Sequence, residues 1–313
     1  MDKKSRILIL GSTGMVGGSI VRQLKKLEYS NLLLPDEFML DLTNQESVMR
    51  YFRENEPEYV FLAAAKVGGI YANSTQQADF GYINGMIELN IIYAAYKFKV
   101  KKLLFLGSSC IYPRDCPQPI KEEYLLTGKL EQTNEMYALA KILGLKLCEA
   151  YNLQYKTNFI SCMPTNLYGI NDNFDLQNSH VLPALIRKFH EARAENKSQV
   201  EVWGTGKPRR EFLFVDDLAD ACVFLMNNYN SNDTINVGCG FDVTIKELAE
   251  TIKDITGFSG DIHWNIEKPD GTPRKILDVS RINEIGWKAR TGLREGLEIT
   301  YKWFIDNQDK IRK

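Results

Sequence analysis

The chain alternates short, unbroken apolar runs with longer segments in which apolar residues recur at helical spacing. Unbroken apolar runs indicate strands of a parallel sheet that is covered on both faces. Strands are expected at RILIL, at LLL near 32, at YVFLAAA (59–65), at KLLFLG ending at 107 and at NFISCMP, with helices from Met15 to about Leu27, near 82–98 and from about Asn134 to Tyr155. This rhythm predicts an α/β protein with a Rossmann-type, doubly wound parallel sheet.

The rhythm breaks after about Pro164, where the sequence becomes polar and rich in loops. A helix at 181–194 and a strand at VEVWG follow, and FVDDLADACVFLMNN with TINVG forms a further helix and strand that could rejoin the sheet. We therefore predict two domains: a dinucleotide-binding domain of residues 1–165 plus about 212–238, and a smaller, discontinuous C-terminal substrate domain of about 166–211 plus 239–313. Crevices between such units bind small ligands.

Composition narrows the class of protein. The 313 residues carry 39 basic and 40 acidic side chains, well mixed, for a net charge of -1. Such a balance predicts no nucleic-acid partner and no recruitment to an anionic membrane. The N-terminus has no signal-peptide pattern, and no apolar run approaches the roughly 20 residues that span a bilayer. Six scattered cysteines without zinc-site spacing predict no metal and reduced thiols in the cytoplasm.

The first strand is followed by a glycine-rich loop in ILILGSTGMVGGSIVRQL, with Gly11, Gly14 and Gly17 spaced as GxxGxxG. Glycines there allow a tight turn and let a helix N-terminus approach a pyrophosphate. A merely tight turn is the ordinary alternative, but the place directly after the first strand favours dinucleotide binding. The expected contacts are Gly11, Ser12, Thr13, Gly14, Met15, Val16 and Gly17.

Coenzyme choice is normally set after the second strand, which here is followed by LLLPDEF with Asp36 and Glu37 and no arginine. An acid there binds the ribose hydroxyls of NAD, so the residue chemistry favours NAD(H). Both acids could equally be solvated loop charges. Other residues placed to line the adenine and nicotinamide halves are Asp41, Leu42, Ala63, Ala64 and Ala65.

Catalytic chemistry is predicted at EMYALAKILG, where Tyr137 and Lys141 share one face of a helix. An ammonium beside a phenol favours the phenolate, and Ser108 after the preceding strand can hold a carbonyl oxygen. The three would form a proton-donating site for a ketone that receives hydride. A second YxxxK, Tyr93 and Lys97, precedes the serine strand and indicates an ordinary helix surface.

The glycine loop, the serine strand and YxxxK, in this order, resemble the extended, nucleotide-sugar branch of the short-chain dehydrogenase/reductase superfamily. Longer stretches are similar to the GDP-L-fucose synthase family, the GDP-4-keto-6-deoxymannose 3,5-epimerase/4-reductases. They are LAAAKVGGIYAN (62–73), LGSSCIYP (106–113), YALAKILGLKLCEAYN (137–152), MPTNLYG (163–169), NSHVLPALIRKFHEA (178–192), REFLFVDDLA (210–219) and KPDGTPRKILDV (268–279). The resemblance runs essentially from end to end.

This resemblance implies roles for further residues. The reductase set falls on Ser108, Tyr137 and Lys141, and the epimerase thiol and imidazole fall on Cys110 and His180. Without the resemblance, Cys110 would be taken as a small buried hydrophobe and His180 as a helix-start residue. The resemblance adds coenzyme contacts at Leu106, Gly107, Pro164, Thr165, Asn166, Leu167 and His180, and substrate contacts at Lys188, Trp203, Arg210 and Asp270.

The implied function is the NAD(P)H-dependent reduction of a GDP-4-keto sugar with 3,5-epimerisation, giving GDP-L-fucose or a related GDP-sugar. NADPH is placed first because biosynthetic reductions usually use it, and NADH second. The alternatives are a C4 reductase of another GDP-4-keto sugar such as a heptose, without epimerisation, and a nucleotide-sugar epimerase or dehydratase that keeps its coenzyme bound. A coenzyme-sensing binding protein would not need an intact Ser/Tyr/Lys set.

The resemblance also implies a homodimer, formed by the helices near 82–98 and 134–155. An apolar stripe of Leu139, Leu143 and Leu147 on the second helix fits such an interface. The same stripe could instead face the sheet.

Overall fold

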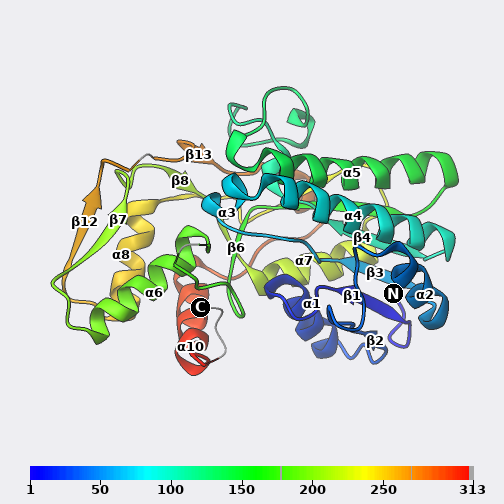
Figure 1. The fold of residues 1–313 in the computed structure, drawn as a ribbon, viewed down its shortest axis with the longest axis horizontal. Helices are drawn as coiled ribbons and strands as arrows, with labels where there is room; N and C mark the ends of the chain where they lie inside the picture. Colours follow the sequence, from blue (N-terminus) through cyan, green and yellow to red (C-terminus); the bar gives the residue numbers. More distant parts are fainter. Residues whose placement is uncertain (177, 269, 310–313) are drawn as a thin grey trace.

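The computed structural model describes residues 1–176, 178–268 and 270–309. Its centre is a six-stranded parallel sheet in the order β10-β5-β4-β3-β1-β2 (Figure 1). The strands are β1 (Ile7–Leu10), β2 (Leu32–Leu33), β3 (Tyr59–Leu62), β4 (Lys102–Leu106), β5 (Phe159–Pro164) and β10 (Ile235–Val237). The predicted Rossmann-type α/β fold is confirmed.

Helices cover both faces of this sheet. Leu8 and Leu10 pack with the apolar residues of α2, α4 and α5, whereas Ile7 and Ile9 pack with those of α1 and α7. Successive strand residues point to opposite faces, and both faces are buried, which is why the strands are unbroken apolar runs. The covering helices are α1 (Met15–Lys26), α2 (Gln45–Asn55), α4 (Gln77–Lys97), α5 (Glu135–Tyr155) and α7 (Val215–Asn228), with the short α3 (Ile70–Thr75) before α4.

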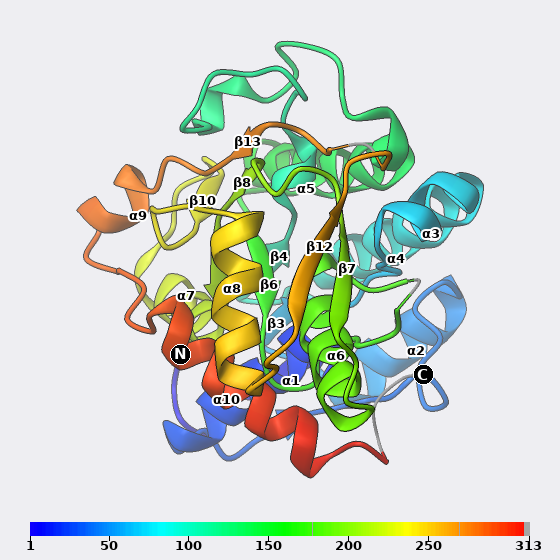
Figure 2. The same cartoon turned by 90° about the vertical axis from the view of Figure 1, so that its left-hand side faces the viewer.

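A second group of elements lies beside the main sheet in Figure 1 and faces the viewer in Figure 2. It has its own apolar core. Its strands are β6 (Asn166–Tyr168), β7 (Gln199–Trp203), β8 (Arg209–Arg210), β9 (Phe212–Phe214), β11 (Val243–Thr244), β12 (Asp261–Asn265) and β13 (Arg274–Lys275). They form three small sheets, β11-β8-β13, β12-β7 and β6-β9. The remaining helices are α6 (Val181–Ala194), α8 (Ile245–Thr256), α9 (Ser280–Glu284) and α10 (Leu293–Asp306). The proposed two-domain division stays a prediction.

Some details differ from the sequence-based expectation. Helix α4 begins at Gln77 rather than near 82, and the helices α2, α8 and α10 were not predicted. All six cysteines carry free thiols. Within the described part of the chain, no helix is both long and apolar enough to cross a membrane.

Candidate active site

The candidate site residues follow the carboxyl ends of the central strands. Gly11 follows β1, Ala63 to Ala65 follow β3, Gly107 and Ser108 follow β4, and Pro164 ends β5. Strand order reverses at β1, since β2 lies on one side of it and β3 on the other. Ligands of doubly wound sheets bind outside the carboxyl ends at such a reversal.

The glycine loop has the shape that a pyrophosphate needs. Gly11 has a φ of +82°, which favours glycine, and a Cβ on Gly17 would lie 2.1 Å from the Gly11 carbonyl oxygen. Gly14 caps α1 without a side-chain hydrogen bond, and the first turn of α1 contains no acidic residue. Backbone N–H groups of Ser12, Thr13, Met15 and Val16 therefore stand around a helix N-terminus suited to an anion. The residues present fit a dinucleotide coenzyme.

The acids after β2 are partly engaged within their own turns. Asp36 accepts hydrogen bonds from the N–H groups of Phe38 and Met39, and Asp41 accepts two from Thr43. The bond from the Thr43 hydroxyl is the largest cause of the lowered pKa of Asp41. Glu37 is exposed, and Leu42 offers its carbonyl to Asn90. No arginine or lysine occurs between 32 and 42.

Other residues that are expected to contact the coenzyme donate hydrogen bonds to backbone carbonyl groups of the protein. Lys141 Nζ donates to the Leu106 carbonyl, and the Asn166 amide and the Thr165 hydroxyl both donate to the Glu211 carbonyl. Leu167 lies half-buried in β6. These contacts fix the backbone that would border the nicotinamide.

Ser108, Tyr137 and Lys141 come together between β4 and α5. The Ser108 hydroxyl accepts a hydrogen bond from the Cys110 N–H at 3.2 Å and also interacts with the Tyr137 phenol. Lys141 Nζ lies 5.9 Å from the centre of the Tyr137 ring. One helical turn separates the tyrosine and the lysine, so the sequence spacing produces this pairing.

The charge state of Tyr137 differs from the expectation. Burial raises its pKa, and the Cys110 and Glu88 charges raise it further, against a lowering by the Ser108 hydroxyl. The lysine does not offset this, because its ammonium lies 3.2 Å from a Glu88 carboxylate oxygen and 3.1 Å from the Leu106 carbonyl. The phenol therefore carries a proton, as a proton donor must.

Cys110 lies between two hydrogen-bond donors. The Asn134 amide nitrogen is 3.3 Å from its sulfur, and Lys275 Nζ is 3.7 Å away. Asn134 precedes α5, whereas Lys275 comes from β13 in the second group of elements. The sulfur thus has a neutral amide donor on α5's N-terminal side and a cation from the second group of elements within reach.

His180 caps α6 from an exposed position. Surrounding protein atoms lower the pKa of its imidazole, and the Lys275 charge lowers it further. Lys275 thus contacts the Cys110 sulfur and also lowers the pKa of His180 through its charge. The lowered pKa makes the imidazolium a stronger acid and leaves it less populated at neutral pH.

Two of the expected substrate residues, Trp203 and Arg210, lie in strands of the small sheets, whereas Lys188 lies on α6 and Asp270 lies outside the strands. Trp203 is 61% exposed, and the ammonium groups of Lys188 and Lys268 lie 5.5 and 5.3 Å from its ring centre. Arg210 is the register partner of Lys275 between β8 and β13, so it stands close to Cys110. Asp270 accepts hydrogen bonds from the N–H and hydroxyl of Thr205, and so tethers its own loop.

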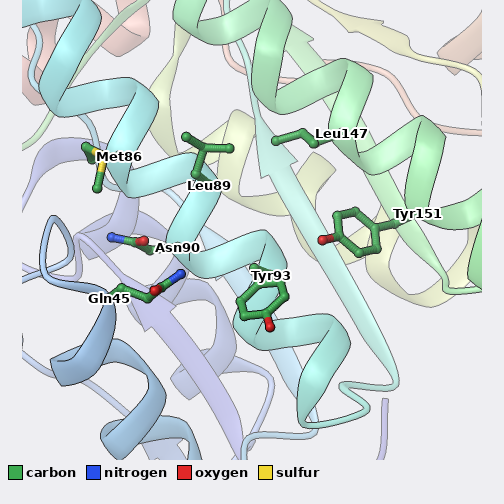
Figure 3. Close-up of a pocket in the computed structure, with 7 residues that line it drawn as sticks. All are labelled: Gln45, Met86, Leu89, Asn90, Tyr93, Leu147 and Tyr151. Atoms are coloured by element: carbon green, nitrogen blue, oxygen red, sulfur yellow. The ribbon is translucent and has the colours of Figure 1, made fainter.

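The second YxxxK pair lies on an outer surface. Lys97 Nζ is 5.4 Å from the ring centre of Tyr93. Tyr93 lines a hollow between α4 and α5, together with Leu89, Leu147 and Tyr151 (Figure 3). This hollow contains none of the candidate catalytic residues.

Three residues near the site were not singled out from the sequence: Glu88, Asn134 and Lys275. Lys275 lies in KPDGTPRKILDV, a stretch already noted for its resemblance, but nothing in the spacing links it to a cysteine far upstream. Glu88 is an acid inside the apolar segment MIELNIIYAA, and that signal was available. A buried charge normally requires a partner.

The fold, the glycine loop and the Ser/Tyr/Lys set define a coenzyme-dependent protein of the extended short-chain dehydrogenase/reductase type. The chain belongs to the NAD dependent epimerase/dehydratase family, whose model matches residues 7–238.

Relatives are similar over nearly the whole chain. The "Putative GDP-L-fucose synthase 2" of Arabidopsis thaliana is 56% identical over 98% of this chain and 94% of its own length. A GDP-L-fucose synthetase from Naegleria fowleri bound to NADP has a TM-score of 0.94 at 30% identity, covering 100% and 96% of the two chains. A GDP-6-OMe-4-keto-L-xylo-heptose reductase from C. jejuni has a TM-score of 0.93 at 40% identity, covering 98% and 99%. The predicted membership and the prediction of an NAD(P)-dependent enzyme are confirmed.

Proposed function

We propose that the protein is an NAD(P)H-dependent 4-ketoreductase of a GDP-4-keto sugar with 3,5-epimerase activity, which makes GDP-L-fucose or a related GDP-sugar. The observation that carries this proposal is the position of Cys110. Its thiol lies two residues from Ser108, influences Tyr137, and accepts from Lys275. This arrangement would offer a proton donor for a ketone oxygen and, close by, a base for the neighbouring C–H groups.

Reduction is assigned to Ser108, Tyr137 and Lys141. The coenzyme, when bound, supplies hydride to C4 of the sugar. Ser108 holds the C4 oxygen by a hydrogen bond, and Tyr137, which carries a proton, transfers it to that oxygen as negative charge develops there. Lys141 is placed beneath Tyr137 to hold the coenzyme ribose.

Epimerisation is assigned to Cys110 and His180. C–H groups at C3 and C5 adjoin the C4 ketone, so a base can remove their protons. The Cys110 thiolate, stabilised by Asn134 and Lys275, would take each proton, and His180 would return one to the opposite face. The ketone must be intact for this step, so epimerisation precedes reduction.

The binding proposals follow from the charges around the cleft. Arg210 and Lys188 supply cations for the diphosphate, since guanidinium and ammonium groups bind phosphate oxygens. Trp203 offers an exposed ring for the base, and Asp270 shapes its loop through Thr205. NADPH stays first and NADH second, although the residues after β2 favour NADH.

The assembly proposed is a cytoplasmic homodimer formed through α4 and α5. Leu139 and Leu143 are 44% and 39% exposed, so these two residues of the apolar stripe are open to a partner, whereas Leu147 is half-buried and packs against the core. Tyr82 and Leu89 on α4 are exposed as well, and the hollow of Figure 3 lies between the two helices. A second copy of the same face would cover these apolar side chains.

A C4 reductase without epimerisation is the second candidate. The similarity to a GDP-6-OMe-4-keto-L-xylo-heptose reductase favours it. The two candidates share Ser108, Tyr137 and Lys141 and differ in the use of Cys110.

One experiment separates them. The protein is incubated in D₂O with GDP-4-keto-6-deoxy-D-mannose or with a GDP-4-keto-heptose, each with NADPH or NADH, and the products are examined by NMR. We expect coenzyme oxidation, deuterium at C3 and C5, and inverted centres at both carbons. Reduction without deuterium at C3 and C5 would establish the plain reductase, and no coenzyme oxidation with any of these substrates would contradict both.

A further inference from the structure

Glu88 on α4 buries its carboxylate against α5, the helix that carries Tyr137 and Lys141. Glu88 is 1% exposed and Lys141 is 3% exposed, and Glu88 Oε1 lies 3.2 Å from Lys141 Nζ. The other oxygen, Oε2, accepts the N–H of Gly144 at 3.1 Å. Glu88 thus binds α5 at two points one turn apart.

Stability alone does not account for this ion pair. Removing two charges from water costs free energy that their attraction barely returns, so apolar side chains would join α4 and α5 at least as well. Position 144 also leaves room for the carboxylate because it lacks a side chain: a Cβ there would lie 2.6 Å from Glu88 Oε2 and 2.6 Å from Phe105 Cζ. The local sequence is arranged to admit a charge.

The Glu88 carboxylate can influence the proposed reduction site through its contact with Lys141. The lysine ammonium forms an ion pair with Glu88 Oε1 at 3.2 Å and donates a hydrogen bond to the Leu106 carbonyl at 3.1 Å. The Lys141 ammonium also lies over the Phe105 ring, with Nζ 4.9 Å from the ring centre. These contacts leave the ammonium little freedom, at 5.9 Å from the Tyr137 ring centre.

We propose that Glu88 is a positioning residue for the reduction: it fixes the Lys141 ammonium under Tyr137 and balances its charge, so that Tyr137 keeps its proton until the ketone oxygen takes it. This inference rests on the proposed reductase function. Glu88 does not touch substrate or coenzyme and acts through Lys141.

The neighbouring titratable groups agree with this role. Burial raises the pKa of Glu88, while Lys141 and the Gly144 N–H act in the opposite direction. The Glu88 charge in turn raises the pKa of Tyr137 and that of Cys148, both on α5. Cys110, beyond Tyr137, adds to the effect on the phenol.

The test is the pH profile of kcat for ketone reduction by E88Q. Glutamine keeps the shape and the acceptor for Gly144 but removes the charge. Without the Glu88 charge, which raises the pKa of Tyr137, the phenol loses its proton more readily, so the alkaline limb should move to lower pH by about one unit or more. We expect kcat at neutral pH to fall about tenfold or more.

Two further variants make the result specific. E149Q removes a carboxylate from a partly exposed pair with Lys146 on α5 and should leave the profile unchanged. E88D keeps the charge but moves the carboxylate away from Lys141, because its side chain is shorter. Its kcat should therefore fall, while the alkaline limb of its pH profile should stay at the wild-type pH. A wild-type profile in E88Q overturns the proposal. If E88Q does not fold, an undiminished kcat in E88D overturns it.

The activity of the wild-type protein distinguishes a failure of the proposed function from a failure of the role proposed for Glu88. If it oxidises no coenzyme with any GDP-4-keto sugar, the proposed function fails. If it is active and E88Q keeps its alkaline limb, only the role of Glu88 fails.

Discussion

Cys110 and Ser108 are two residues apart, yet the structure gives them different partners. Ser108 interacts with Tyr137, whereas Cys110 accepts from Asn134 and Lys275. A thiol has no place in proton delivery to a ketone, but removal of a C–H proton does need a base. The two halves of the proposed reaction therefore separate at single residues.

Substitution of Cys110 tests this separation. C110S should lower deuterium incorporation at C3 and C5 by about a hundredfold or more, because a serine hydroxyl is a far weaker base than a stabilised thiolate. Hydride transfer to a 4-keto sugar that already has the product configuration should stay within a few fold. C116S, a partly buried free thiol in the same loop region, serves as the control. Full exchange in C110S would remove the cysteine from the mechanism.

Substitution of Tyr137 tests the reductase half. Y137F removes the proton donor, and kcat for ketone reduction should fall by about a hundredfold or more. Deuterium exchange at C3 and C5 should continue, since the base and its donors remain. Near-normal reduction by Y137F would show that another group protonates the C4 oxygen.

At the residue scale, sequence order sufficed to predict that Ser108, Tyr137 and Lys141 lie together. Short-range spacing links the tyrosine to the lysine, and a strand end presents the serine. It did not suffice for Lys275, which reaches Cys110 only through the pairing of β13 with β8. The direction of the Tyr137 pKa was also missed, because it depends on burial and on Glu88.

Among the elements, the turn from β1 into α1 has the tightest steric requirement. A Cβ on Gly17 would overlap the Gly11 carbonyl, whereas one on Gly18 would meet nothing closer than 3.4 Å. We expect G17A to weaken coenzyme binding by more than about tenfold, because the loop must open where the pyrophosphate lies. G18A should bind normally, and fluorescence titration with NADPH and NADH measures both. Equal affinities for the two variants would contradict the assigned role of the loop.

Elements of the central sheet were predictable because each strand is an apolar run bounded by a helix pattern. In the second group of elements, α6 and β7 were predicted, but β8, β11 and β13 were not, since each contains two residues and exists only through tertiary pairing. Helix α8 could have been predicted from the sequence. Thr244 and Glu247 form a reciprocal capping box at its N-terminus, and TIKE is the sequence signature of that box.

On the scale of the whole molecule, the proposed dimer depends on the apolar face of α4 and α5. Charged side chains at its centre should prevent association, so a protein with both L139E and L143E should sediment as a monomer. L126E, which changes another exposed leucine outside these helices, should leave the dimer intact. A monomeric wild-type protein in analytical ultracentrifugation would contradict the interface.

The contact between Lys275 and Cys110 has a consequence for how such enzymes can diverge. The proposed reductase set lies on α5 and in the loop after β4, whereas Cys110, the proposed epimerase base, is in contact with a lysine from β13 in the other group of elements. A small change in how the β8 and β13 segments dock can thus silence proton exchange and leave hydride transfer intact. Descendants of one bifunctional ancestor could therefore lose epimerisation repeatedly while they keep both Cys110 and His180. The presence of that pair in a sequence is then weaker evidence of epimerase activity than the position of Lys275 in the structure.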